Sequence, residues 1–164
     1  MKRFRLDWVV EVAVLFTVLG LSEVVPVNTV WILLDRSVAL SKVVVVTSET
    51  IPQSKLSLVK TIIGEDLSVD SVDHLRVPEV DIERAVNLVK GRILREKESG
   101  EEVLVDVTGG RKTMSIACYK AGIEAGCKVI YVHLRDEKYF NWLYPLIPRH
   151  KYSLVLLYEP SSTK

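Results

Sequence analysis

Residues 106–114 contain the residue types that best suit phosphate chemistry in this sequence, and they read Asp-Val-Thr-Gly-Gly-Arg-Lys-Thr-Met. An apolar run ends at Val107 and an amphipathic run begins at Arg111, so the two glycines form a turn from a strand into a helix. Bare backbone N–H groups at the start of a helix, with cations beside them, hold phosphate. The segment therefore predicts a phosphate site built from Thr108, Gly109, Gly110, Arg111 and Lys112.

Two common phosphate-binding motifs do not fit this segment, and one simpler interpretation does. The nucleotide-triphosphate loop requires Gly, four residues and then Gly-Lys-Ser/Thr, and neither that spacing nor G-x-G-x-x-G occurs in the chain. The simpler interpretation is that a Gly-Gly turn is the tightest route from strand to helix, with Arg111 and Lys112 as ordinary solvated charges. The local sequence leaves both interpretations open.

Length and charge limit the classes of protein to which the chain can belong. Its 164 residues suit one domain with a sizeable core, placed at residues 1–159, and residues 160–164 are predicted to form a disordered tail. The 22 basic residues balance the 21 acidic ones, so no overall field draws the chain to duplex DNA or to an anionic membrane, and any nucleic-acid ligand must be bound locally. We expect neither duplex DNA nor a membrane as a partner.

The cysteines and histidines give no sign of a disulfide or a metal site. Cys118 and Cys127 lie nine positions apart, which suits neither a disulfide framework nor zinc. The three histidines are scattered along the chain. We therefore expect two buried thiols in a reducing compartment, no metal and no cofactor.

The amino-terminal region superficially resembles a secretory signal, with basic residues ahead of an apolar stretch over residues 8–21. Asp7 and Glu11 interrupt that pattern, and no small-x-small cleavage site follows it. The stretch is also shorter than the roughly 18 to 20 uncharged residues that a membrane-spanning helix needs. We therefore predict that this stretch forms a buried strand and that the protein is cytoplasmic.

Apolar, β-branched runs alternate with amphipathic segments, which is the pattern of βαβ units. The predicted strands cover residues 10–16, 43–47, 72–77, 103–107, 128–134 and 152–157. The predicted helices cover residues 24–35, 53–63, 80–97 and 111–125. Most of the strands are nearly all apolar, as strands covered on both faces must be. The expected fold class is α/β: a doubly wound, Rossmann-like, mostly parallel six-stranded sheet with helices on both faces.

Right-handed crossovers give such a series the strand order 3-2-1-4-5-6, which makes the first and fourth strands neighbours. Their helices leave on opposite faces, and ligands bind in the crevice at the carboxyl ends of such a pair. The loops lining that crevice would be residues 18–23 and 108–112. The topology therefore places the Gly-Gly turn at the expected ligand site without using the motif itself as evidence.

Two further loops add candidate ligand contacts. The first loop contributes Gly20, Leu21 and Ser22, although a serine at this position more commonly caps the following helix. After the second strand, Thr47 and Ser48 offer hydroxyls to a ribose or a base, with an ordinary polar loop as the alternative.

Three stretches of the chain are similar to one known family. Residues 103–114 follow the pattern hydrophobic-Asp-hydrophobic-Thr-Gly-Gly-x-Lys-x-Met, and residues 17–22 and 43–49 add two less specific matches. On these grounds the sequence resembles, over nearly its whole length, the CRISPR-associated Rossmann fold (CARF) domains of type III CRISPR systems.

The resemblance implies binding of a cyclic oligoadenylate, most often cyclic tetra-adenylate, across the two-fold axis of a homodimer. Each protomer would supply residues 108–112 to half of the ring, with the bases against the Ser48 loop. A stand-alone domain best resembles the ring nucleases, which cleave this RNA messenger without metal and so switch off antiviral signalling. The alternatives are a non-catalytic sensor or sponge acting through a partner, and a generic nucleotide-binding α/β module.

The implied reaction is attack of a ribose 2′-hydroxyl on the adjacent phosphorus, which gives a 2′,3′-cyclic phosphate and a 5′-hydroxyl. Such chemistry requires an aligned nucleophile and stabilised charge. The resemblance makes Lys112 the residue that stabilises the charge and Ser22 the one that positions the reacting group, with N–H bonds from Gly109 and Gly110. Arg111 is the alternative to Lys112.

The chain departs from the resemblance directly after Ser22, because similar ring nucleases continue with Pro-Gly and this chain continues with Glu23-Val24. A carboxylate near bound phosphates repels them, so either Glu23 points away or catalysis is slow or absent. Residues 135–149, with four clustered aromatic residues, have three open interpretations: a lid, a dimer contact or core cover. Aromatic enrichment at interfaces favours the dimer contact.

Overall fold

Six strands form one sheet in the computed structural model, which describes residues 12–161. The sheet order is β3-β2-β1-β4-β5-β6, and every neighbouring pair is parallel except the antiparallel pair β5 and β6. The strands are β1 (Ala13–Leu19), β2 (Leu40–Ser48), β3 (Ser71–Val77), β4 (Glu102–Asp106), β5 (Lys128–Leu134) and β6 (Tyr152–Tyr158). The predicted strand order and fold class are confirmed.

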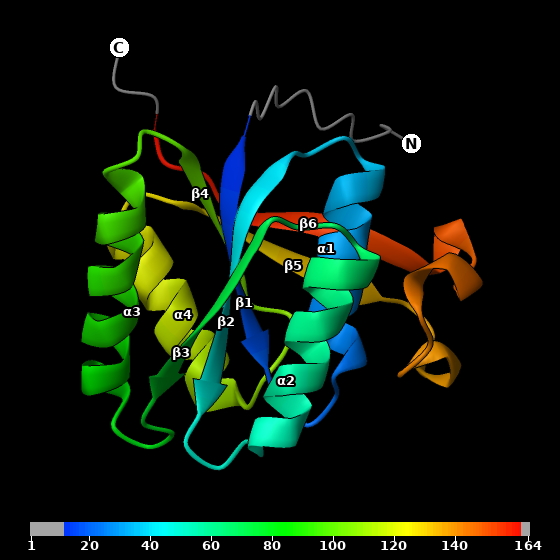
Figure 1. Cartoon of the computed structure of the whole chain (residues 1–164), viewed down its shortest axis with the longest axis horizontal. Coiled ribbons are helices and arrows are strands. Elements are labelled where there is room, and N and C mark those ends of the chain that lie inside the picture. The colour runs from blue at the N-terminus through cyan, green and yellow to red at the C-terminus, as the bar shows by residue number, and fades with distance from the viewer. Residues whose placement is uncertain (1–11, 162–164) are drawn as a thin grey trace.

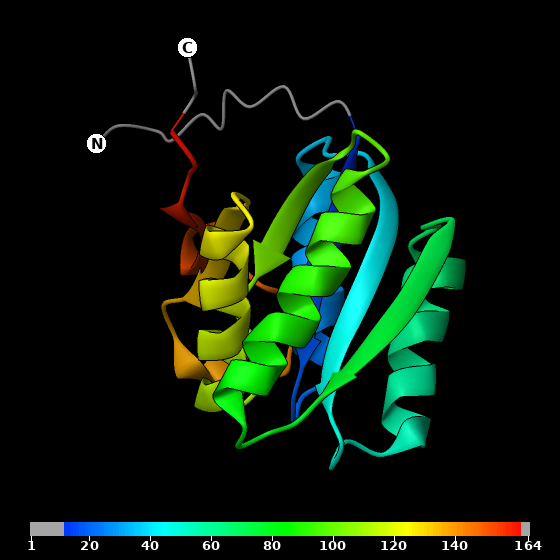
Figure 2. The ribbon, with the colours of Figure 1, turned by 90° about the vertical axis from the view of Figure 1, so that its left-hand side faces the viewer.

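Helices cover both faces of the sheet (Figures 1 and 2). They are α1 (Val24–Asp35) and α2 (Gln53–Thr61) on one face, and α3 (Ile82–Lys97) and α4 (Lys112–Glu124) on the other. Successive residues of β1 alternate between two cores: Phe16 and Val18 pack toward α3 and α4, and Leu15 and Leu19 toward α1 and α2. This two-sided burial explains why the central strands are almost continuously apolar.

Several boundaries differ from the sequence prediction by one to three residues; for example, β2 begins at Leu40 instead of Val43, and α3 begins at Ile82 instead of Val80. The first strand was expected to end at Phe16, but β1 continues to Leu19 because its pairing with β2 extends to the partners Leu19 and Thr47. The first loop therefore begins at Gly20. The second helix ends at Thr61 and is prolonged by a π-helical turn, Ile62–Asp66.

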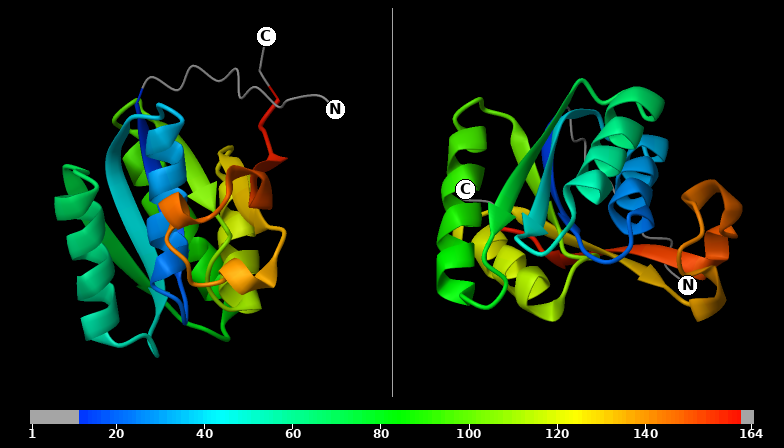
Figure 3. Two further views of the ribbon diagram at one scale, coloured as in Figure 1. Left: turned by 90° about the vertical axis from the view of Figure 1, so that its right-hand side faces the viewer. Right: turned by 60° about the horizontal axis from the view of Figure 1, so that its bottom comes forward.

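The connection between β5 and β6 contains three short 3₁₀ turns, at Glu137–Tyr139, Tyr144–Leu146 and Arg149–Lys151. We call residues 135–149 the strap. It lies against α1, on the side of the molecule away from α3 and α4 (Figure 3). Because the strap carries no crossover helix, the chain returns antiparallel along β5.

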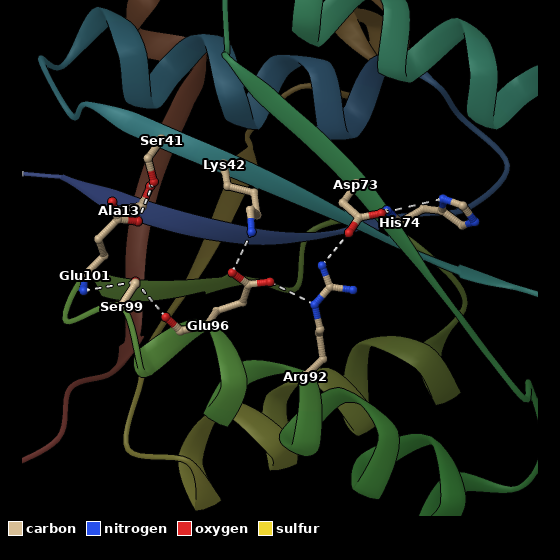
Figure 4. Close-up of polar contacts among 9 residues, drawn as sticks. All are labelled: Ala13, Ser41, Lys42, Asp73, His74, Arg92, Glu96, Ser99 and Glu101. Atoms are coloured by element: carbon tan, nitrogen blue, oxygen red, sulfur yellow. Dashed lines mark hydrogen bonds and ion pairs between the residues drawn. The ribbon is translucent and has the colours of Figure 1, made fainter.

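A network of ion pairs joins α3 to the sheet near the amino ends of β2 and β3 (Figure 4). Glu96 accepts hydrogen bonds from Lys42 at 2.9 Å and from Arg92 at 2.8 Å, and Arg92 also reaches Asp73 at 2.5 Å. The hydrogen bond from Arg92 holds the pKa of Asp73 below its ordinary value. Burial works to raise the pKa of Glu96, but Lys42 and Arg92 bring that pKa below its ordinary value.

Some predictions concern residues outside the described part of the chain. The expected start of the first strand at Val10, the interruption of the apolar stretch by Asp7 and Glu11, and residues 162–164 of the expected tail all lie there. Between residues 12 and 161, no helix has the length and apolar character needed to cross a membrane.

Candidate ligand-binding site

The backbone pairing of β1 and β4 stops at Phe16 and Val105. Beyond that point the two strands are joined by side chains, because the Thr17 hydroxyl donates to the Asp106 carboxylate at 2.7 Å. Asp106 is completely buried. Burial raises the pKa of Asp106, and hydrogen bonds from Thr108 and Thr17 oppose that effect by favouring the carboxylate.

Thr108 connects the end of β4 to β5. Its hydroxyl donates to Asp106 at 2.5 Å and accepts from the Val132 N–H at 2.8 Å, and its backbone N–H also donates to Asp106 at 3.0 Å. The carboxylate thus fixes the first residue of the turn. A ligand contact by Thr108 remains a prediction, since its hydroxyl already has a donor and an acceptor within the chain.

The glycines bring the two predicted loops into backbone contact. A Cβ atom on Gly109 would lie 2.2 Å from the Val18 carbonyl oxygen, and one on Gly20 would lie 2.6 Å from the Gly110 Cα. Gly110 adopts a φ of +86°, which L side chains rarely adopt. The sequence left open whether these glycines serve packing, and they do: they let the Gly-Gly turn pack closely against the first loop.

The turn leaves backbone donors exposed at the start of α4. The N-cap residue Arg111 is extended, and no side chain caps the helix. Within residues 12–161, the backbone N–H groups of Gly110, Arg111 and Lys112 have no acceptor, and all three residues are exposed. These N–H groups lie at the positive end of the α4 dipole, so the turn has the donors and the field that an anion requires.

The two cations after the turn have different surroundings. Arg111 forms an ion pair with Glu79, whose side chain is only 13% exposed and which also accepts from Thr50 at 2.9 Å. Lys112 is exposed and has no partner among the described side chains. An incoming anion can therefore bind Lys112 without breaking an ion pair, whereas it must compete with Glu79 for Arg111.

Glu23 points toward α2 rather than toward the turn. Its carboxylate lies 3.2 Å from Lys55 Nζ, and Lys55 also donates to the Leu21 carbonyl at 2.5 Å. A hydrogen bond from its own backbone N–H, together with Lys55, lowers the pKa of Glu23. Of the two possibilities that the sequence left open for Glu23, its orientation away from the turn is the one observed.

The remaining predicted contacts divide into exposed and covered residues. Leu21 is exposed, and Ser22 does not cap α1 but donates its hydroxyl to Asn141 of the strap at 2.5 Å. Thr47 and Ser48 are 1% and 2% exposed, so neither side chain is accessible to a ligand in this conformation. The Ser48 hydroxyl is hydrogen-bonded to Thr50 at 2.8 Å.

A cavity of about 570 Å³ lies between α1, β5 and the strap, and Thr108 forms part of its wall. Most of its lining is apolar or aromatic, including Tyr131, Tyr139, Phe140, Tyr144 and Ile147. The sequence reveals the aromatic cluster of the strap but not what the cluster faces. Its position beside α1 depends on the antiparallel return of β6.

A comparison of the chain with models of known protein families shows the family to which it belongs. Residues 23–157 match the family model of the Card1 CARF domain. The chain belongs to the CARF family. The resemblance predicted from the sequence is confirmed. A search of curated proteins finds no significant match.

Solved structures share the fold of this CARF domain at low sequence identity. A Vibrio cholerae protein, VC1899, is 16% identical over 89% of this chain and 33% of its own, with a TM-score of 0.66. Can2 from Sulfobacillus thermosulfidooxidans, in complex with cyclic tetra-adenylate, is 16% identical over 77% of this chain and 32% of its own, with a TM-score of 0.52. Csm6 from Enterococcus italicus, bound to cyclic hexa-2′-fluoro-hexa-dAMP, is 19% identical over 74% of this chain and 34% of its own, with a TM-score of 0.56. The chain thus spans about a third of these relatives.

In this CARF domain the predicted site residues fall into two groups. The residues that share the carboxyl edge of β1 and β4 are Gly20, Leu21, Ser22, Thr108, Gly109, Gly110, Arg111 and Lys112. Thr47 and Ser48 are the last two residues of β2, and both are buried. Sequence reasoning missed Glu79, Asn141 and the cavity, because their partners lie in distant parts of the chain.

Proposed function

We propose that this CARF domain binds a cyclic oligoadenylate, with cyclic tetra-adenylate as its preferred ring, and cleaves it without metal. The observation that carries the proposal is the uncapped turn at Gly110 and Arg111, with the unpaired Lys112 beside it. Two structural relatives, Can2 and Csm6, are bound to cyclic oligonucleotides, which supports this ligand class for a member of the same family.

The ring would bind across a homodimer. A ring of four phosphates has its own symmetry, and two copies of one anion-binding turn related by a two-fold axis match that symmetry. Gly110, Arg111 and Lys112 are exposed, so nothing in the described part of the protomer covers the turn. Each protomer would bind half of the ring.

The cavity beside Thr108 offers a place for a purine base, in preference to the Ser48 loop. Its volume of about 570 Å³ lies within the usual range for ligand sites, and its tyrosines can stack on a base. The Ser48 hydroxyl, by contrast, is buried and already hydrogen-bonded. The bases would then lie on the α1 side of the phosphate turn.

The proposed reaction is an internal transesterification. The ribose 2′-oxygen bonds to the adjacent phosphorus as its proton leaves, and the bond from phosphorus to the 5′-oxygen breaks as that oxygen gains a proton. Lys112 and the bare N–H groups of the turn would stabilise the charge on the phosphorane. Ser22 would orient the attacking ribose. The cleavage makes a linear product and ends the signal of a type III CRISPR system.

Incubation with labelled cyclic tetra-adenylate in excess chelator tests this proposal. Linear products with a 2′,3′-cyclic phosphate are expected, together with retention of the ring before turnover. A protein that neither retains nor cleaves the ring would be a generic nucleotide-binding α/β module, and the proposal would be wrong.

The second candidate function is a sensor or sponge that binds the ring without cleaving it. The observation that favours this candidate is the departure from the ring-nuclease pattern directly after Ser22, where this chain has Glu23-Val24 in place of Pro-Gly. The same experiment separates the two functions, because a protein that only binds the ring leaves it uncleaved.

A further inference from the structure

The strap is fixed to α1 by a two-point clamp. Asn28 of α1 donates from Nδ2 to the Trp142 carbonyl at 2.8 Å, and its Oδ1 accepts from the Tyr144 N–H at 2.8 Å. Tyr144 is 8% exposed, and its hydroxyl donates to Asp35 at 2.5 Å. The segment that follows Asn141 is therefore held on the helix by three hydrogen bonds, two to its backbone and one to a side chain.

Asn141 connects this clamp to the predicted ligand site. It adopts a φ of +66°, in the left-handed region that asparagine tolerates better than most residues. Its Oδ1 accepts the Ser22 hydroxyl hydrogen at 2.5 Å, across 119 positions of the sequence. Through this bond the strap contacts the loop that follows β1. The Ser22 side chain makes no other hydrogen bond among the described residues.

This hydrogen bond decides what Ser22 can offer to a ligand. A serine hydroxyl has one hydrogen and two lone pairs, and here the hydrogen points to Asn141. The side that faces solvent is therefore an acceptor. It can accept a hydrogen bond from a ribose hydroxyl, but it cannot form one with a phosphate oxygen, which has no hydrogen to donate.

We propose that Asn141 is a positioning residue that holds the Ser22 hydroxyl as an acceptor for a ribose 2′-hydroxyl, and so makes the site selective for ribose over 2′-deoxyribose rings. The inference rests on the proposed function, because it concerns the same ligand. It extends that function by assigning a role to the strap and by stating which ligand group the first loop recognises. A 2′-hydroxyl that donates to Ser22 also has a lone pair free for attack on phosphorus.

The test compares the binding of cyclic tetra-adenylate with that of its 2′-deoxy analogue. One hydrogen bond is worth a factor of about ten in affinity, and a ring bound across the dimer makes this bond once to each protomer. The wild-type protein is therefore expected to prefer the ribose ring by about a hundredfold. Asn141→Gly keeps the left-handed backbone and removes the acceptor, and the preference should fall to nearly one. Asn141→Asp keeps an acceptor oxygen and should retain the preference, although its charge weakens the binding of both rings.

Ser22→Ala distinguishes positioning from a structural role. It should abolish the preference by itself, and adding Asn141→Gly to it should change the ratio no further. A purely structural Asn141 would lower the melting temperature while leaving the ratio at its wild-type value, and that result would overturn the inference. Equal wild-type affinity for both rings would also overturn it and would leave the proposed function standing. Failure to bind either ring would remove the proposed function, and this inference with it.

Discussion

At the scale of single residues, Lys112 and Arg111 are neighbouring cations with different surroundings. Lys112 has no hydrogen-bond or ion-pair partner within the described residues, so its removal breaks no such bond. We predict that Lys112→Ala lowers the single-turnover cleavage rate by about a hundredfold or more. The free energy of unfolding should change by less than about 0.5 kcal/mol. Unchanged single-turnover rates would remove Lys112 from the mechanism.

Arg111 is expected to affect stability as well as binding. Arg111→Ala leaves Glu79, 13% exposed, without its cation. We predict a loss of about 1 kcal/mol in urea unfolding, because exposed ion pairs contribute little and Arg111 is 61% exposed. Adding Glu79→Gln should restore most of this loss by removing the unpaired charge. If the double variant is as unstable as the single one, the ion pair is not the cause.

Gly110 is required by its backbone conformation and by its neighbour. A Cβ atom there would lie 2.4 Å from Val18 Cγ1, at a φ of +86°. We predict that Gly110→Ala destabilises the protein by about 2 kcal/mol and weakens ring binding. Gly91 of α3 is the matched control, because a Cβ there meets nothing within 4 Å. Gly91→Ala should stabilise the protein by about 0.5–1 kcal/mol. If both variants lose a similar free energy of unfolding, the backbone conformation of Gly110 and its contact with Val18 are not the cause.

At the scale of elements, α3 is attached to the sheet by the ion pairs of Arg92 and Glu96 (Figure 4). The folded-state pKa values of Asp73 and Glu96 lie below the ordinary values of 3.8 and 4.5. As the pH falls through those ordinary values, the unfolded chain takes up protons before the folded protein does. This contribution to stability is therefore present above about pH 5 and is lost progressively below it.

We predict that Arg92→Leu flattens this acid dependence. The variant lacks the hydrogen bonds that lower both carboxyl pKa values, so it should be less stable at pH 7 by about 1–3 kcal/mol. Its unfolding free energy should then vary less than that of the wild type between about pH 5 and pH 3. Urea titrations at a series of pH values measure both effects. Parallel pH curves for the two proteins would show that the network does not cause the acid sensitivity.

At the scale of the whole molecule, the site on one protomer is half of the proposed ligand site. The carboxyl edge of β1 and β4 carries one exposed turn, and a ring with several phosphates requires two. We predict that native mass spectrometry finds one ring bound to two chains. A complex of one ring with one chain would contradict the dimeric site and would leave the turn as a monomeric anion site.

The sequence predicted the order of the elements, the sheet topology and the location of the turn. The reason is physical: strands such as β1 are buried on both faces, and this burial forces apolar composition that can be read locally. The length of β1 was harder to predict, because the pairing of Leu19 with Thr47 extends the strand beyond the first strand's expected end. Glycine spacing fixed the turn, since Gly110 needs a left-handed backbone.

By itself, then, the sequence determined the order of the strands and helices and the position of the Gly-Gly turn of this CARF domain. Only the tertiary structure decided that Arg111 is paired and Lys112 is not, and that Ser22 faces Asn141 instead of capping its own helix. It also decided that Ser48 is buried. The periodicity of apolar residues along the sequence predicts which residues are buried. The partner of a polar side chain depends instead on which loops meet in space, and Ser22 and Asn141 are 119 positions apart in the chain.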